Sequence, residues 1–127
     1  MLKQSPVTTI LPVVDTDRAR RFYEEVLGLE EERRLPDGSV VLRAGGSAIE
    51  LSRRARAVPS PYTVASFEVR DISREVNDLE ARGVHFEDYD LPDLKTDRHV
   101  CVLGSERADW FKDPDGNILC LHEQAGV

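Results

Sequence analysis

One arrangement of residues occurs twice in this chain, and the repetition restricts the folds open to it. Each copy has a β-rich run, a helix-capping residue, a helical apolar stripe and a glycine. The first copy begins at Val7 and closes its helix with Gly28; the second begins at Thr63 and closes with Gly83. The residues able to cap the two helices are Asp15 or Thr16, and Asp71 or Ser73. The repeat predicts two similar α+β modules.

Turn signals divide the residues after each helix into strands. In the first copy, residues 36–38 (PDG) and 45–46 (GG) separate β-rich runs, as hairpin turns do. In the second copy, residues 113–117 (DPDGN) do the same, because proline presets one turn dihedral and glycine supplies a positive φ. The expected strands are 7–14, 29–35, 39–44 and 47–53, then 63–70, 84–87, 99–103, 107–112 and 118–122. Each copy is therefore predicted to form a βαβββ-like module.

The two modules are small enough to share one domain. A chain of 127 residues fits a single domain with a sizeable core. Two prolines and little periodicity mark residues 54–62 as a linker. We expect one domain over residues 1–127, with module one at about 5–53 and module two at about 63–123.

Composition excludes several classes of function. The net charge of −7 argues against general nucleic-acid binding, because an acidic surface repels phosphates. No apolar run is long enough to cross a bilayer, and the N-terminus lacks the apolar region of a signal peptide. Cys101 and Cys120 lie in apolar runs without paired spacing, which favours reduced thiols. We expect a cytoplasmic protein that binds neither nucleic acid nor membrane.

Three of the expected strands alternate between apolar side chains and smaller or polar ones. Alternation with period two places these sets on opposite faces, so the apolar set packs on a helix and the other set faces a wetter space. The residues of the wetter face include Glu50 and Ser52, Val64, Ser66 and Glu68, and Cys120 and His122. Such a face suits the wall of a binding pocket, although an ordinary solvated face has the same alternation.

Two stretches of the chain carry a resemblance to a known family. The first covers residues 14–23 (VDTDRARRFY) and 26–29 (VLGL), and the second covers residues 110–118 (WFKDPDGNI). With the repeat between them, they make nearly the whole chain similar to the glyoxalase/bleomycin-resistance/extradiol-dioxygenase superfamily, also called the vicinal oxygen chelate family. The resemblance implies an α+β fold of two βαβββ modules that form a half-open mixed sheet around a cavity. The helices would lie on the outer face, and a second subunit often completes the site.

Many enzymes of this superfamily hold a divalent metal with four side chains, one from each of four strands. Carried over by the local motifs, these positions are Thr8, Glu50, Val64 and Cys120. Only Glu50 is an ordinary ligand of the family, Thr8 is a poor donor, and Val64 has no donor atom. The resemblance therefore implies a member of the family without a metal or other cofactor.

Two residues of the second motif have both a functional and a structural interpretation. Trp110 lies where family members often place a pocket-lining aromatic, and it stacks on a planar ligand or belongs to the core. His122 pairs with Glu50 or Glu68 as an acid–base element, or it is a partly exposed polar residue at a strand end. The catalytic candidates are Glu50, Glu68 and His122. The expected ligand-binding residues are Thr8, Glu50, Ser52, Val64, Ser66, Glu68, Trp110, Cys120 and His122.

Two classes of function remain open. The first is a metal-independent protein that sequesters an aromatic or antibiotic-like compound, as in the bleomycin-resistance branch, and the missing ligand set favours it. The second is a metal-free acid–base enzyme, an isomerase or lyase; a metal-dependent glyoxalase or dioxygenase is disfavoured. The acidic residues suggest a ligand with a basic group and a flat ring. The family pattern implies a homodimer, because a half-open sheet leaves an apolar groove exposed.

Overall fold

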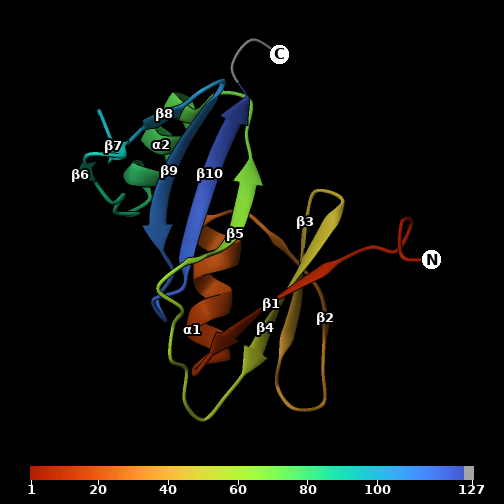
Figure 1. Ribbon diagram of the computed structural model, residues 1–127. Helices are drawn as coiled ribbons and strands as arrows, with labels where there is room; N and C mark the ends of the chain where they lie inside the picture. The colour runs from red at the N-terminus through yellow and green to blue at the C-terminus, as the bar shows by residue number, and fades with distance from the viewer. Residues whose placement is uncertain (125–127) are drawn as a thin grey trace. The chain divides into compact units, whose positions relative to one another are not determined.

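The computed structural model describes residues 1–124 and divides into two compact units, one up to Pro59 and one from Ser60 onward (Figure 1). Each unit contains one four-stranded mixed sheet with helix on one side, so the protein is α+β, as the repeat predicts. In the described part of the chain, no helix is both long and apolar enough to cross a membrane.

The first unit has the βαβββ order. Its elements are β1 (Thr8–Val13), α1 (Thr16–Arg21), η1 (Phe22–Val26), β2 (Glu30–Arg34), β3 (Val40–Ala44) and β4 (Ser47–Arg53). The strands lie in the order β1-β4-β3-β2. The first and last strands of the unit, β1 and β4, are parallel neighbours, and the other pairs are antiparallel. The unit therefore closes by pairing its two ends.

Local chemistry sets the ends of the first helix. The Asp15 carboxylate accepts a hydrogen bond from the Arg18 N–H at 3.1 Å and caps the helix, and Gly28 adopts a φ of 80° just after it. Tyr23 and Ala19 are fully buried, in line with the apolar stripe. The expected helix is not α-helical throughout, because it widens into the π-helical segment η1 from Phe22 onward.

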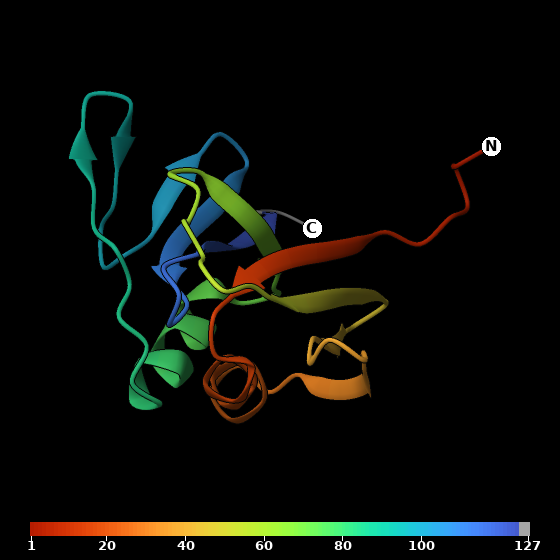
Figure 2. The same cartoon turned by 90° about the horizontal axis from the view of Figure 1, so that it is seen from below.

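The second unit repeats this topology. Its elements are β5 (Thr63–Glu68), α2 (Ile72–Ala81), β6 (Asp90–Leu91), β7 (Leu94–Lys95), β8 (Cys101–Leu103), β9 (Glu106–Lys112) and β10 (Ile118–Gln124). The sheet order β5-β10-β9-β8 matches that of the first unit, again with its first and last strands parallel. The two copies differ in the short hairpin β6–β7, which stands out between α2 and β8 (Figure 2).

Two sequence predictions fail around this hairpin. Residues 84–87 are not a regular strand, since only Phe86 forms an isolated bridge to Phe111. The strand expected from His99 begins at Cys101, because Arg98 and His99 form the centre of a tight turn. Neither turn residue is glycine, so composition does not reveal the turn.

A side-chain network holds the turn between β9 and β10. The buried Asp113 carboxylate accepts hydrogen bonds from the N–H groups of Asp115 and Asn117, at 2.9 Å and 2.8 Å, and from the Asn117 side-chain amide at 2.8 Å. Gly116 has a φ of 88°, where a side chain is disfavoured. These contacts explain why the turn needs an aspartate at position 113, a glycine at 116 and an asparagine at 117.

The core of the second unit contains an unpaired acid. Asp109 lies on β9 opposite Leu121 and shares a face with the fully buried Phe111. It has no exposed surface, and neither carboxylate oxygen has a hydrogen-bond partner in the described part of the protein. Burial raises the pKa of Asp109 to about 7, although the nearby Leu121 N–H and His99 lower it. No pattern in the sequence indicates this buried carboxyl group.

Candidate functional site

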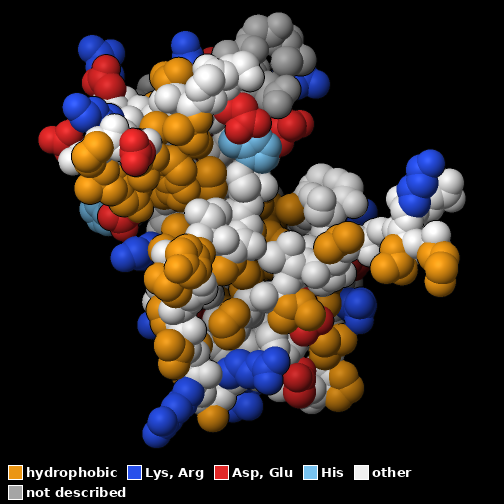
Figure 3. All heavy atoms as spheres, viewed as in Figure 1, with side chains coloured by type: hydrophobic (Ala, Val, Ile, Leu, Met, Phe, Trp, Pro, Cys, Tyr) orange, Lys and Arg blue, Asp and Glu red, His pale blue; other side chains and the backbone are white. Residues whose placement is uncertain are grey.

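Strand register brings several predicted site residues together on the second sheet. Cys120 on β10 lies opposite Ser66 on β5 and opposite Trp110 on β9, so the three side chains share one face. In the next row, His122 on β10 lies opposite Glu68 on β5. On the side of the unit seen in Figure 3, hydrophobic side chains gather over β8 and β9, and a histidine lies beside acidic side chains. We call this face, with its five residues Ser66, Glu68, Trp110, Cys120 and His122, the β5–β10–β9 face.

His122 lies between a hydroxyl group and a carboxylate. Its Nδ1 atom is hydrogen-bonded to the Ser66 Oγ atom, and its Nε2 atom lies 3.8 Å from the Glu68 Oε1 atom. The imidazole is half-buried, whereas the Glu68 side chain is 78% exposed. Of the two acids considered as partners of His122, Glu68 is the one on the adjacent strand. The arrangement can move a proton between a bound molecule and the imidazole, or donate hydrogen bonds to a ligand.

Trp110 is held in place by two residues that the sequence pattern did not indicate. Its indole N–H donates a hydrogen bond to the Thr63 Oγ atom at 3.2 Å. The Tyr89 ring meets the indole edge-to-face, with ring centroids 5.5 Å apart. Burial raises the pKa of Tyr89, so its hydroxyl stays a hydrogen-bond donor at neutral pH. Trp110 is half-buried and so keeps part of its surface for contact.

A register irregularity explains why Thr63 was missed. Thr63 pairs with Ile118 and Ala65 pairs with Leu119, so Val64 has no residue opposite it in β10. Strict alternation placed Val64 on the face of Ser66, whereas the pairing places Thr63 there. Tyr89 precedes the β6–β7 hairpin in a stretch without periodicity, so no sequence signal marks it.

Cys120 is a buried thiol. Its exposed fraction is 7%, and its Sγ atom donates a weak hydrogen bond to the Leu121 carbonyl oxygen at 3.2 Å. Burial raises the pKa of Cys120, with a hydrogen bond from Ser66 opposing the shift. The thiol form therefore dominates at neutral pH, which makes Cys120 a poor nucleophile and a poor metal ligand.

The remaining predicted site residues lie on the first sheet. Thr8 is exposed on β1, Glu50 is half-buried on β4, and Ser52 is buried near the end of the same strand. The pairings Thr8–Ala48 and Ile10–Glu50 place Thr8 and Glu50 on one face. Whether these residues bind a ligand stays a prediction.

Of the four positions that the resemblance predicts for a metal ion, two lack a good donor. Val64 has no donor atom, and the Cys120 thiol is protonated by burial. In residues 1–124, no group of three or more His, Cys, Asp or Glu side chains is placed to hold a metal ion. We therefore assign no metal-dependent step to these residues.

Comparison with known proteins places this geometry in a family. The model of the Glyoxalase/Bleomycin resistance protein/Dioxygenase superfamily matches residues 5–121. None of the curated protein sequences compared with the chain matches it.

Solved structures share the fold across nearly the whole chain. A glyoxalase family protein from Bacillus anthracis is 20% identical with a TM-score of 0.77, and the match covers 95% of both chains. The antibiotic binding protein TnmS3 from Streptomyces sp. CB03234 is 20% identical, with a TM-score of 0.72 and coverage of 98% of this chain and 99% of that one. The lactoylglutathione lyase from Agrobacterium tumefaciens is 23% identical, with a TM-score of 0.70 and coverage of 97% and 96%. The chain therefore belongs to the glyoxalase/bleomycin resistance protein/dioxygenase superfamily.

Proposed function

We propose that this protein binds a planar, antibiotic-like small molecule on the β5–β10–β9 face, without a metal ion and without transforming the ligand. The observation that carries the proposal is the preorganised Trp110. Thr63 and Tyr89 fix the indole, so little conformational entropy is lost when a flat ring stacks on it. A relative with the same fold, TnmS3, is an antibiotic binding protein, which supports this class of ligand.

The side chains next to Trp110 favour a ligand with a basic group. Glu68 is exposed and has only His122 as an ionic neighbour at 3.8 Å among the described residues, so its carboxylate is available to a cation. Ser66 and His122 supply hydrogen bonds on the same face. A flat ring over Trp110 with a basic substituent toward Glu68 uses all of these groups.

Fluorescence of Trp110, the only tryptophan, tests the proposal directly. The probes are thioflavin T, a planar cation, 8-anilinonaphthalene-1-sulfonate, an aromatic anion, and bleomycin. We expect thioflavin T to quench the indole at lower concentration than the anion does. Glu68→Gln is expected to weaken binding of the cation only, whereas Glu30→Gln, at an exposed position on β2 of the first unit, leaves both affinities unchanged. Equal affinity for both dyes, or no quenching by any probe, would overturn the proposal.

Stacking needs its own control. Trp110→Phe keeps an aromatic face and Trp110→Leu does not, so calorimetry should show weaker binding for the leucine variant only. Base or ring stacking on an aromatic side chain contributes about 1–3 kcal/mol, which predicts a loss of about fivefold or more. Equal affinities of the two variants would remove stacking from the proposal.

A second candidate function rests on the Ser66–His122–Glu68 contacts. A histidine between a hydroxyl group and a carboxylate is the arrangement of an acid–base residue, which would make the protein a metal-free isomerase or lyase. His122→Gln separates the two functions. A binding protein keeps its affinity within a few-fold, whereas an enzyme loses turnover of a bound compound, which NMR of the ligand records over time.

The proposal includes a cytoplasmic homodimer. Ile10 on β1 of the first sheet is 57% exposed, next to the half-buried Glu50, and Leu103 on β8 is 43% exposed. Exposed apolar side chains on sheet faces support association with a second copy. Light scattering at micromolar concentration should give twice the chain mass, and a monomer would count against this part of the proposal.

A further inference from the structure

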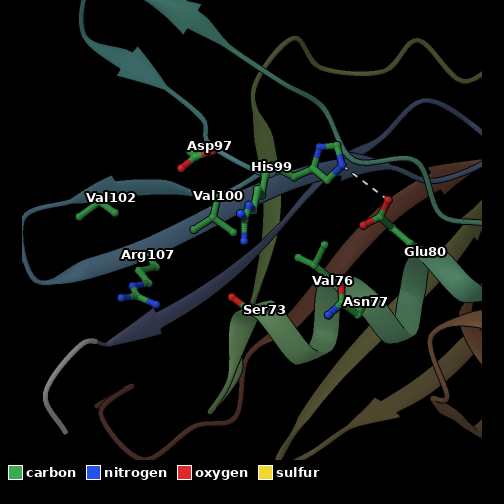
Figure 4. Close-up of a pocket in the computed structure, with 10 residues that line it drawn as sticks. Ser73, Val76, Asn77, Glu80, Asp97, His99, Val100, Val102 and Arg107 are labelled. Atoms are coloured by element: carbon green, nitrogen blue, oxygen red, sulfur yellow. Dashed lines mark ion pairs between the residues drawn. The ribbon is translucent and has the colours of Figure 1, made fainter.

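A hollow lies on the second unit, outside the β5–β10–β9 face. It is a cavity of about 500 Å³ between α2 and the segment that leads through β8 to β9, which is within the range of small-molecule sites. Its lining from α2 includes Ser73, Val76 and Asn77, and its lining from β9 includes Arg107 (Figure 4). None of these residues belongs to the predicted site.

The cations of this cavity have no partners in the described protein. Neither Arg98 nor Arg107 forms an ion pair with any described residue, although acidic residues outnumber basic ones in the chain by 24 to 17. The Ser73 hydroxyl and the Asn77 amide also make no side-chain hydrogen bond in residues 1–124. In Figure 4 the Ser73 hydroxyl and the Arg107 guanidinium lie on facing sides of the cavity. Two guanidinium groups with neutral donors are the groups that bind a carboxylate or phosphate.

The acidic side chains of the lining are engaged or turned away. The Glu80 Oε2 atom lies 3.5 Å from His99 Nε2, and the other ring nitrogen of His99 contacts the Asp88 carboxylate at 2.8 Å. Figure 4 shows the Asp97 carboxylate pointing away from Ser73. The negative charges of these two lining acids disfavour ligands with several negative charges. Valines form the remaining wall and offer an apolar surface: Val76, Val100 and Val102.

The backbone holds Arg98 and His99 in a conformation that their side chains do not favour. The two residues have φ values of 52° and 71° at the centre of a hairpin turn, which backbone hydrogen bonds between Asp97 and Val100 close at 2.8 Å and 3.1 Å. A turn with positive φ at both central positions favours Asn-Gly. Strain of this kind is retained where side chains serve a function, and here both side chains line the cavity.

We propose that this cavity binds a small monocarboxylate that carries a compact apolar group. Arg98 and Arg107 hold the carboxylate, Ser73 and Asn77 complete its hydrogen bonds, and the valine wall packs against the apolar group. The site is separate from the β5–β10–β9 face, so it takes a second ligand.

Amide NMR of the full chain tests the site with three probes: 3-methylbutanoate, acetate and inorganic phosphate. We expect 3-methylbutanoate to shift the amide signals of residues 73–80 and 97–107 and to bind more tightly than acetate. Arg98→Gln and Arg107→Gln should each weaken its binding about tenfold, the loss expected for a charge-assisted hydrogen bond. Arg70→Gln, at an exposed arginine outside the cavity, is the matched control and should bind as the wild type does.

Each other outcome overturns the proposal. No shift in these two segments excludes the cavity as an anion site, and equal binding of acetate removes the role of the valine wall. Tighter binding of phosphate than of 3-methylbutanoate excludes the monocarboxylate class. Urea unfolding of the variants shows that any loss does not come from misfolding. Dye quenching of Trp110 is measured separately, so failure here leaves the proposed function intact.

Discussion

Replacing Asp109 with asparagine should change how stability depends on pH. An aspartate in an unfolded chain has a pKa of about 3.9, whereas burial raises the pKa of Asp109 to about 7 in the folded protein. Between these values the folded state holds a proton that the unfolded state has lost, so the free energy of unfolding falls as pH rises. Below about pH 4 both states are protonated and above about pH 7 both are ionised. The cost of Asp109 is therefore absent at low pH and complete above neutral pH.

The size of this effect follows from the difference in pKa. A shift of about three pKa units corresponds to about 4 kcal/mol, since each unit is about 1.4 kcal/mol. About two of these three units lie between pH 5 and the folded pKa, so about 3 kcal/mol of the cost develops between pH 5 and pH 8. The amide introduced by Asp109→Asn carries no charge at any pH, so the variant should gain about that much relative to wild type between pH 5 and pH 8.

Urea unfolding followed by Trp110 fluorescence measures the effect, because Trp110 lies on the same strand as Asp109. Asp93→Asn, at an exposed position, controls for the loss of one negative charge from a chain of net charge −7. The comparison uses the change between the two pH values, so a constant cost of burying the amide cancels. If the difference between Asp109→Asn and wild type is the same at pH 5 and pH 8, the argument from burial is refuted.

Three further predictions concern the same unit. Arg98→Asn should raise the free energy of unfolding by about 0.5–1 kcal/mol in urea titrations. Asparagine tolerates the left-handed backbone conformation, which costs other residues about 1–2 kcal/mol. An unchanged urea midpoint would show that the backbone of this turn is not strained. Asp113→Ala should lower the free energy of unfolding by about 3 kcal/mol, since three hydrogen bonds to its carboxylate are lost. A fall of less than about two degrees in the midpoint of thermal unfolding would contradict this prediction. Cys120 should react slowly with iodoacetamide at pH 7.5 in the folded protein and rapidly in urea, because burial raises its pKa; mass spectrometry showing equal rates would exclude a buried thiol.

Short sequence motifs predicted the ends of the helices and the bounds of one strand. Asp15 and Asp71 cap the two helices as expected, and Gly28 and Gly83 have the positive φ values that end them. The residues of β4 match the expected strand in full. These features depend on neighbours in sequence, and so the sequence alone indicates them.

The features that were missed depend on distant parts of the chain. The irregularity at Val64 exists only in the pairing of β5 with β10, and it decides that Thr63 supports Trp110. The turn at Arg98 and His99 contains no glycine, so the sequence does not predict it. Alternation did group Ser66, Glu68, Cys120 and His122 on one face, and register brings them together, but their role in binding stays a prediction.

The pairing of the first and last strand in each unit has a consequence for folding. Thr8 pairs with Ala48, about 40 residues later, and Ser66 pairs with Cys120, about 54 residues later. Closing such long loops costs chain entropy before any stabilising contact forms. These parallel pairs therefore form slowly compared with the hairpins β3–β4 and β9–β10. During synthesis, β1 therefore waits unpaired until β4 has been made, and β5 waits for β10. Pro12 on β1 and Glu68 on β5 limit the aggregation of these unpaired strands in the meantime.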